Sequence, residues 1–197
     1  MNRTFGAPDP TLTPGFTDPV HQANTCFRAI LLAMSSPGCI VNLPVTLHPP
    51  IPFSSASAAI LLTLTDSATP INVAAATEYA QRWIDFHCSA PQSDLAQADF
   101  VFAAQRPTLA SLRQGSEETP ETSASLILDL PHFIHGRRYR LSGPGIETST
   151  LMQVPLDEWF VTEWNAMYQR APCGIDLILC AERQIIALPR SIKIEEC

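Results

Sequence analysis

The chain begins with a helical pattern that has clear ends. Asp18-Pro19 places a capping side chain before a proline at the first helical position, which is a common start for a helix. The run Ser35-Ser36-Pro37-Gly38 ends the segment. Between these ends, apolar residues recur at helical spacing and predict an amphipathic helix: Val20, Phe27, Ile30, Leu31 and Met34.

Four more helices and a series of short strands follow from the same kind of reading. The helices are predicted over about 55–65, from about 77, over 107–114 before Gly115, and over about 156–170. Short apolar runs between turn residues predict the strands: 39–43, 70–74, 100–103, 125–130, 138–141, 175–180 and 184–188, with 153–154 as a candidate extension.

Helices alternate with strands until the last third of the chain, where strands become adjacent. This order predicts a three-layer α/β/α fold with a mixed sheet that closes in an antiparallel hairpin. Residues 1–17, rich in proline, threonine and glycine, are expected to form an N-terminal tail. Residues 18–197 are expected to form one α/β domain.

Composition narrows the function classes. Apolar residues make up 46% of the chain and charged residues 16%, against about 25% charged in a typical soluble domain. Either a large core or a surface covered by another protein explains this, and both explanations stay open. The net charge of −7 and the lack of a basic stripe argue against a nucleic-acid partner. The apolar runs are too short to cross a membrane, so we expect a cytoplasmic protein.

The cysteines and the lysine limit the cofactors. The six cysteines have neither CxxC nor zinc-site spacing, so we expect reduced thiols and no bound metal. Lys193 is the only lysine, and it lies in a strand-like tail, which makes a pyridoxal phosphate Schiff base improbable. We therefore expect no cofactor. The glycine-rich, nucleophile-elbow and zinc-protease motifs of common enzymes are also missing.

Two neighbouring features are candidates for phosphate or substrate contact. Arg138 and Arg140 point to one face of a predicted strand, where two guanidinium groups can grip a phosphate. The alternative is a charged edge strand exposed to solvent. Gly143 and Gly145 flank Pro144 in a turn whose N–H groups can form an anion-binding nest, although Pro144 removes one donor. The alternative is an ordinary turn.

Two other features are candidates for catalysis, and no catalytic residue is assigned from either. His87 and Cys88 are a candidate imidazole–thiolate pair, but adjacent helical residues point in different directions. The alternative for His87 is a hydrogen-bonded histidine at a helix end. Asp176 enters an otherwise apolar strand and must find a partner there. It serves either as an acid or base, or as a hydrogen-bonding group that fixes the turn after Pro172.

Several segments in order resemble the PhnH family of carbon–phosphorus lyase subunits, from about residue 18 to the end. The first is Phe27-Arg28 with Ala33-Met34-Ser35-Ser36-Pro37-Gly38, similar to the opening of that family. The others follow in sequence: Leu61-Leu62-Thr63-Leu64-Thr65-Asp66, Thr69-Pro70, Phe86-His87, Ala90-Pro91, Ala98-Asp99-Phe100, Leu112, Gly115, Pro120-Glu121, Leu126, Leu141, Gly143, Gly145, Ile146, Gly174-Ile175-Asp176-Leu177-Ile178-Leu179, Glu182-Arg183 and Pro189-Arg190.

The resemblance implies a fold akin to the large domain of pyridoxal-phosphate-dependent transferases, without the cofactor. It implies a homodimer in isolation and a core assembly with G, I and J subunits. That assembly, with an ATP-binding-cassette-type L subunit, is linked to displacing adenine from ATP by an alkylphosphonate such as methylphosphonate. The product is ribose 1-alkylphosphonate 5-triphosphate, and the later radical step belongs to the J subunit.

The resemblance brings no catalytic residue with it. We therefore expect a structural or assembly role within a transferase complex (alpha-D-ribose 1-methylphosphonate 5-triphosphate synthase), with an isolated chain that is not catalytic. The alternative is a small standalone hydrolase or transferase that uses His87 and Cys88, or Asp176.

Overall fold

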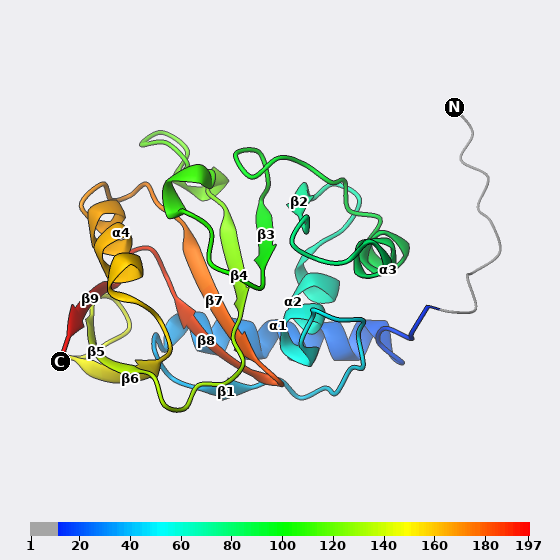
Figure 1. Ribbon diagram of the computed structural model, residues 1–197, viewed down its shortest axis with the longest axis horizontal. Helices are drawn as coiled ribbons and strands as arrows, with labels where there is room; N and C mark the ends of the chain where they lie inside the picture. Colours follow the sequence, from blue (N-terminus) through cyan, green and yellow to red (C-terminus); the bar gives the residue numbers. More distant parts are fainter. Residues whose placement is uncertain (1–11) are drawn as a thin grey trace.

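A six-stranded mixed β-sheet forms the centre of the computed structural model, which describes residues 12–197 (Figure 1). Its strand order is β1-β8-β7-β4-β3-β2. Four neighbouring strands run parallel: β2 (Ile71–Asn72), β3 (Phe100–Ala103), β4 (Ser125–Asp129) and β7 (Asp176–Ala181). Two more, β8 (Gln184–Leu188) and β1 (Val41–Asn42), join antiparallel at one side. The predicted α/β class, the mixed sheet and the closing hairpin are confirmed.

Side chains of the central strands alternate between two hydrophobic clusters, as the two-residue period of a strand requires. Phe102, Ile127 and Ile178 pack in one cluster with three helices: α1 (Pro19–Ser35), α2 (Ser55–Leu64) and α3 (Glu78–Cys88). Their immediate neighbours in sequence, such as Leu126 and Leu177, pack in the other cluster with α4 (Glu158–Tyr168). A sheet buried on both faces explains why its strands read as continuous apolar runs.

A second sheet of three antiparallel strands packs in the same cluster as α4. Its order is β6 (Thr150–Val154), β5 (Arg137–Ser142), β9 (Lys193–Glu196). Tyr139 and Leu141 of β5 are fully buried in that cluster. In Figure 1 this sheet lies beside α4, close to the C-terminus. Because β5 is the middle strand, the interpretation of its arginines as an edge strand is wrong.

Local capping accounts for the start of each α-helix. Asp18 accepts the N–H of His21 at the start of α1, as predicted. Ser54 begins α2, and Thr77 begins α3 by accepting the N–H of Ala80. Asp157 begins α4 in the same way. Each cap satisfies one of the backbone donors that a helix leaves unpaired at its first turn. None of the helices within residues 12–197 is both long and apolar enough to span a membrane.

The predicted helix over 107–114 is wrong. Only a 3-10 turn, η1 (Leu109–Ser111), forms there, and a second such turn, η2 (Pro120–Thr122), follows. The side-chain amide of Gln114 donates to the carbonyls of Leu109 (2.8 Å) and Leu112 (3.1 Å). The carbonyl of Leu109 would accept the N–H of Arg113 in the predicted α-helix, so the side chain competes with helix formation. The buried Leu109 and Leu112 are three residues apart, which suits either structure.

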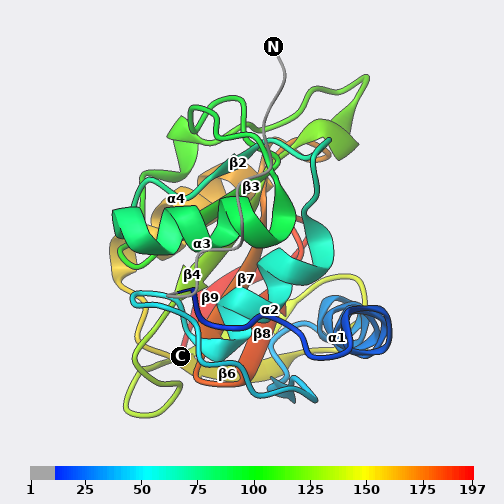
Figure 2. The same ribbon diagram turned by 90° about the vertical axis from the view of Figure 1, so that its right-hand side faces the viewer.

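The apolar stripe of α1 does not all face the core. Cys26, Ile30 and Ala33 are buried, whereas Val20 is 77%, Phe27 44% and Leu31 51% exposed. Leu32 and the following Ile40 are exposed as well. Figure 2 shows α1 end-on at the margin of the molecule. The helix therefore presents an unpartnered apolar surface within the described chain, formed by Val20, Phe27, Leu31 and Leu32 and called the α1 surface below.

Candidate functional site

A pocket of about 540 Å³ lies where the parallel strands begin. Phe100, Ser125 and Asp176 are the first residues of β3, β4 and β7, and all three line it. Register places Ser125 between the other two, opposite Phe100 on one side and Asp176 on the other. The rest of the wall comes from the end of α2, from η2 and from loops: Leu64, Thr69, Asp99, Arg113, Glu121, Thr122, Ser123 and Arg190. We call this the amino-edge pocket.

Asp176 is held by an arginine that is distant in sequence. Nη2 of Arg190 lies 2.5 Å from Oδ2 of Asp176, and both the backbone N (2.9 Å) and Nε (3.2 Å) of Arg190 donate to Oδ1. Nη1 of the same guanidinium donates to the carbonyl of Pro120. The guanidinium therefore contacts both carboxylate oxygens, which is the geometry of a strong and specific ion pair. The hydrogen-bonding interpretation of Asp176 is thus favoured. The segment that Asp176 holds is Pro189-Arg190 and not, as predicted, the turn after Pro172.

A second pair in the pocket is more open. Nη1 of Arg113 lies 2.8 Å from Oδ1 of Asp99, and the two side chains are 34% and 36% exposed. Beside it, Ser123 is only 8% exposed, and its Oγ has no hydrogen-bond partner among the described residues. Burying a hydroxyl without a partner costs free energy, so such a group needs an explanation.

Many of the segments that resemble the PhnH family meet in this pocket. Thr69, Asp99, Glu121, Asp176 and Arg190 each belong to one of those segments, and each lines the wall. Sequence reasoning named Asp176 but missed the pocket, because its walls come from six separate parts of the chain. A signal for the pocket was present in the sequence, because a charged or hydroxyl residue stands at or just before the start of three apolar strands. These residues are Asp99 before β3, Ser123 before β4 and Asp176 at the start of β7.

The opposite end of the parallel strands holds a buried carboxyl that the sequence reading also missed. Asp129, the last residue of β4, accepts hydrogen bonds from the N–H of Ser54 (2.8 Å), Oγ of Ser54 (2.6 Å) and Oγ of Ser57 (2.6 Å). Burial raises the pKa of Asp129, and the bonds from the two serines oppose that rise.

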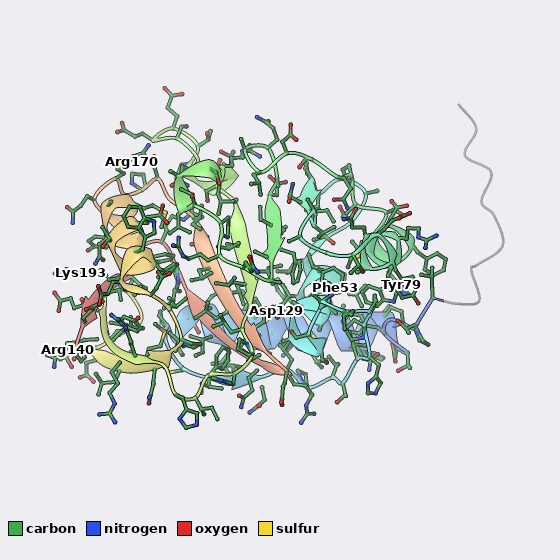
Figure 3. All side chains as sticks on the ribbon, viewed as in Figure 1. Phe53, Tyr79, Asp129, Arg140, Arg170 and Lys193 are labelled. Carbon is green, nitrogen blue, oxygen red and sulfur yellow. The ribbon has the colours of Figure 1, made fainter. Side chains whose placement is uncertain are left out.

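Asp129 therefore occupies the N-terminus of α2. It lines a pocket of about 430 Å³ with Phe53 and Glu182, and Figure 3 shows Asp129 and Phe53 in the middle of the molecule. Ligands of open α/β sheets usually bind at this carboxyl end, often at a helix N-terminus. In this chain Asp129 accepts the N–H of the cap residue Ser54, while the N–H of Ala56 donates to the carbonyl of Glu182 and the N–H of Ser57 donates to Oγ of Ser54.

The arginines proposed for phosphate contact lie on the exposed face of the small sheet. Arg138 and Arg140 are both exposed, on the face opposite to buried Tyr139, as the strand period predicts. Arg140 stands across from Glu195 of β9, and the pKa of Glu195 is lowered by Lys193 and, to a smaller extent, by Arg140. Figure 3 places Arg140 and Lys193 together at this side of the molecule. A contact between the two arginines and substrate stays a prediction.

The glycines of the predicted nest are explained by packing. Gly143 and Gly145 have φ angles of +140° and +84°. A Cβ on Gly145 would lie 2.7 Å from the carbonyl oxygen of Ser35, and one on Gly143 would lie 2.7 Å from that of Ser191. The turn thus fits against the last residue of α1, where helix carbonyls carry partial negative charge and disfavour an anion. This geometry accounts for both glycines without a ligand, and phosphate contact stays a prediction.

His87 and Cys88 do not form a nucleophile and base within the described structure. A ring nitrogen of His87 lies 3.3 Å from the carbonyl oxygen of Thr13, and burial lowers the pKa of His87. Cys88 is buried, its thiol donates to the carbonyl of Leu61 (3.8 Å), and burial raises its pKa. A raised thiol pKa opposes formation of the thiolate that nucleophilic catalysis requires. His87 is the hydrogen-bonded histidine in the last turn of α3 that was the alternative prediction.

Lys193 and the cysteines suit the expectation that the chain holds no cofactor or metal. Nζ of Lys193 lies 2.6 Å from Oε1 of Glu195, and this hydrogen bond raises the pKa of Lys193. Schiff-base chemistry needs the neutral amine, which the raised pKa disfavours. The six cysteines are all free, and residues 12–197 contain no group of three or more metal-binding side chains. Both expectations stay predictions for the protein in solution.

Comparison with known proteins places the chain in a family. Residues 14–195 match the family model described as "Bacterial phosphonate metabolism protein (PhnH)". The chain is 33% identical over 187 residues to "Alpha-D-ribose 1-methylphosphonate 5-triphosphate synthase subunit PhnH" of Rhizobium meliloti (strain 1021), covering 91% of this chain and 94% of that protein. It is 30% identical over 203 residues to "Putative C-P lyase subunit protein HtxG" of Stutzerimonas stutzeri, covering 98% and 96%.

These matches confirm the resemblance drawn from the sequence segments. The chain is a mixed-sheet α/β protein of bacterial phosphonate metabolism, and it belongs to the PhnH family.

Proposed function

We propose that this chain is a subunit of the carbon–phosphorus lyase core complex in phosphonate catabolism. In that complex it is required for making ribose 1-alkylphosphonate 5-triphosphate from ATP and an alkylphosphonate such as methylphosphonate. The observation that carries the proposal is similarity over nearly the whole length to a relative named as a subunit of that synthase. A second relative, named as a putative C-P lyase subunit, supports the same role.

The role within the complex is assembly and positioning rather than chemistry. Cys88 is a poor nucleophile because burial raises its pKa, and Asp176 is engaged by Arg190. Lys193 is paired with Glu195. The isolated chain should therefore turn over neither ATP nor phosphonate. A subunit can still be essential, because holding reactants and catalytic groups in place supplies much of the rate enhancement of an enzyme.

The α1 surface supports a role in protein contacts. Val20, Phe27 and Leu31 form an exposed apolar stripe on one helix, Leu32 is exposed beside it, and exposed apolar patches commonly mark interfaces. Our proposal is a homodimer when the chain is isolated and a hetero-oligomer with the G, I and J subunits when they are present. We also propose that the assembly works in the cytoplasm, because its proposed reaction uses ATP and ATP is available there.

The finer architecture is part of the same proposal. Two hydrophobic clusters divide the central strands by alternate residues, and this favours three layers with the sheet in the middle. The order of parallel strands followed by an antiparallel hairpin is compatible with the large domain of pyridoxal-phosphate-dependent transferases. An overlay of backbone coordinates on such a domain would test this likeness directly.

Co-purification tests the proposal. A tagged chain expressed with the G, I and J subunits should retain all three under mild salt, and deletion of its gene should abolish growth on methylphosphonate as the only phosphorus source. Failure of the wild-type chain to co-purify would remove the central claim. Robust turnover of ATP or phosphonate by the isolated chain would favour the standalone enzyme instead.

A matched pair of variants then tests the α1 surface. Leu31→Asp changes a residue that is 51% exposed on α1, whereas Leu151→Asp changes one that is 63% exposed on β6. Both should fold, because surface substitutions cost little stability. Leu31→Asp should reduce co-purification at least about tenfold, the loss expected for one buried apolar contact, while Leu151→Asp should not. Equal retention of both variants would place the interface elsewhere.

A further inference from the structure

We propose that two copies of this chain pair through α4, with Trp159 of each copy inserted into a pocket on α4 of the other. This inference rests on the proposed homodimer and deepens it by naming the residues that meet. The α1 surface then stays free for the other subunits.

Trp159 is an exposed side chain on a rigid element. It is 64% exposed, whereas the other two tryptophans, Trp83 and Trp164, are fully buried. It lies in the first turn of α4, directly after the residues that cap and begin the helix. A tryptophan buries a large apolar area at a small entropic cost, which is why this residue type often carries the binding energy of an interface.

A mainly apolar pocket of about 160 Å³ lies further along the same face of α4. At about 100° per residue, Ala166 and Arg170 lie within roughly 20° of Trp159 around the helix axis, and Ala166 lies about 10 Å further along it. The face therefore presents a large ring and, two turns later, a hollow beside a small residue. The walls come from α4 and from the segment around η1: Leu109, Gln114, Glu163, Ala166, Met167 and Arg170.

The ring and the hollow fit each other across two copies, not within one, because about 10 Å separates them along α4. Antiparallel packing of two α4 helices about a two-fold axis beside Thr162 places Trp159 of each copy on Ala166 of the other. Two-fold contacts have this form, in which residue i meets residue j and j meets i. Glu163 lies near the axis too, but its side chain is only 15% exposed and lies 2.5 Å from Nη1 of Arg106, which offsets its charge.

The pocket also offers a partner for the polar atom of the ring. The side-chain amide N–H groups of Gln114 donate to the carbonyls of Leu109 and Leu112, and its Oε1 makes no hydrogen bond within residues 12–197. A buried indole N–H needs an acceptor. Gln114 Oε1 can accept the N–H of the incoming Trp159.

Charge favours the antiparallel arrangement. Arg170, which Figure 3 places at the end of α4 far from Arg140 and Lys193, has no ion pair among the described residues. Antiparallel packing brings it towards the start of the other α4. Two carboxylates lie there, those of Asp157 and Glu158, and their side chains remain 65% and 68% exposed beside arginines of their own chain. A parallel pair would instead bring equal charges together.

The area sets the strength of the contact. Two tryptophans bury on the order of 300 Å², against roughly 1,200 Å² for a small but stable interface. Exposed residues beside the pocket and on α4 can supply more: Thr108, Ala110, Ser111 and Thr162. With two tryptophans as its main anchors, the dimer should dissociate on dilution, which makes the equilibrium measurable.

The experiment is sedimentation equilibrium of the isolated, full-length chain. The wild type should be a dimer that dissociates on dilution, and its tryptophan emission should then move to longer wavelength as Trp159 becomes exposed. Trp159→Ala should weaken the dimer at least about a hundredfold, because each dimer loses two anchors. Ala166→Gln, which places a larger side chain in the pocket, should weaken it at least about tenfold.

Leu151→Ala is the matched control. Leu151 is 63% exposed, almost the same as Trp159, but it lies on β6. This variant should dimerise as the wild type does. All three variants should keep the circular dichroism spectrum of the wild type, because the changed side chains are exposed.

Three results would overturn the proposal. The first is a wild-type chain that stays monomeric at every concentration. The second is a Trp159→Ala or Ala166→Gln variant that dimerises as tightly as Leu151→Ala. The third is a dimer that Leu31→Asp dissociates while Trp159→Ala does not, which would place the contact at the α1 surface. The measurement uses none of the other subunits, so the α4 contact and the subunit role tested by co-purification can fail separately.

Discussion

Asp129→Ala is expected to lower the free energy of unfolding more than the loss of an ordinary helix cap does. The carboxylate accepts three hydrogen bonds, from the N–H and Oγ of Ser54 and from Oγ of Ser57. After truncation the two hydroxyls still have partners nearby, since Ser54 Oγ lies 3.2 Å from Ser57 Oγ, and Ser57 Oγ lies 3.3 Å from the carbonyl of Ser54. The N–H of Ser54 has no such substitute.

The magnitude follows from these contacts. Leaving the N–H of Ser54 unsatisfied costs about 1–3 kcal/mol, and losing a negative charge at the N-terminus of α2 costs about 0.5–1 kcal/mol more. Together they lower the free energy of unfolding by about 2–4 kcal/mol, which for this size of chain lowers the melting temperature by roughly 4–16 °C. Urea unfolding followed by circular dichroism measures the loss.

The control is Asp157→Ala, which removes the N-cap of α4. Its carboxylate accepts the N–H of Phe160 (2.7 Å) and lies 3.7 Å from Nη2 of Arg106, and its side chain is 65% exposed. That variant should lose about 1 kcal/mol, the usual value of an N-cap. The reasoning would be refuted if Asp129→Ala lost no more stability than Asp157→Ala.

The stability of the wild type and of Asp129→Asn, compared as a function of pH, shows whether burial or hydrogen bonding dominates the pKa of Asp129. Burial raises the pKa of Asp129 above its ordinary value, so ionising the carboxyl costs more in the folded chain than in the unfolded chain. The wild type should therefore lose stability relative to Asp129→Asn as the pH rises from the ordinary aspartate pKa, about 4, to the raised value. Above it the difference should be constant. A wild type that gains stability over this range would mean that the serine hydrogen bonds outweigh burial.

Three further predictions concern the other candidate groups. Arg138→Ala combined with Arg140→Ala should change the melting temperature by only a few degrees, because exposed strand arginines contribute little to stability. If the pair contacts substrate, the assembled variant should bind substrate less tightly. Unchanged binding and turnover would mean that the two arginines are solvent-exposed charges. Thiol titration should count six thiols after unfolding but fast reaction only at the exposed Cys39 and Cys197 in the native chain, since burial raises the pKa of Cys88 and Cys180; stoichiometric zinc or iron would contradict this. Visible absorbance should show no saturable aldimine band with added pyridoxal phosphate, because Lys193 is kept protonated by Glu195.

Elements fixed by local interactions were predicted correctly from the sequence. The start of α1 follows from Asp18 and Pro19, which act within one turn of the helix. Strand β3 matches its predicted range. The two strands of the β7–β8 hairpin begin and end within one residue of their own predicted bounds. The alternation of helices and strands was enough to give the mixed sheet, because parallel strands need a crossover between them.

Features that depend on distant parts of the chain were not predicted. Strand β5 was placed correctly, yet its position between β6 and β9 depends on residues about fifty positions further along. Asp176 was recognised as a charge in need of a partner, but Arg190 comes from the loop after the next strand. The apolar stripe of α1 indicated the helix and could not say which of its sides would be buried, since both sides carry apolar residues.

The edges of the central sheet restrict how another protein can join it. Both outer strands, β1 and β2, are only two residues long. Adding a strand from a partner needs a longer row of free backbone N–H and C=O groups, so β-augmentation is closed at this sheet, and the same shortness guards against edge-to-edge aggregation. Within residues 12–197, the five-residue β6 is the longer free edge, because Asn165 of α4 already bonds the N–H and the carbonyl of Ile194 in β9. A partner segment that pairs by backbone hydrogen bonds would therefore lie alongside the sheet that carries Arg138 and Arg140.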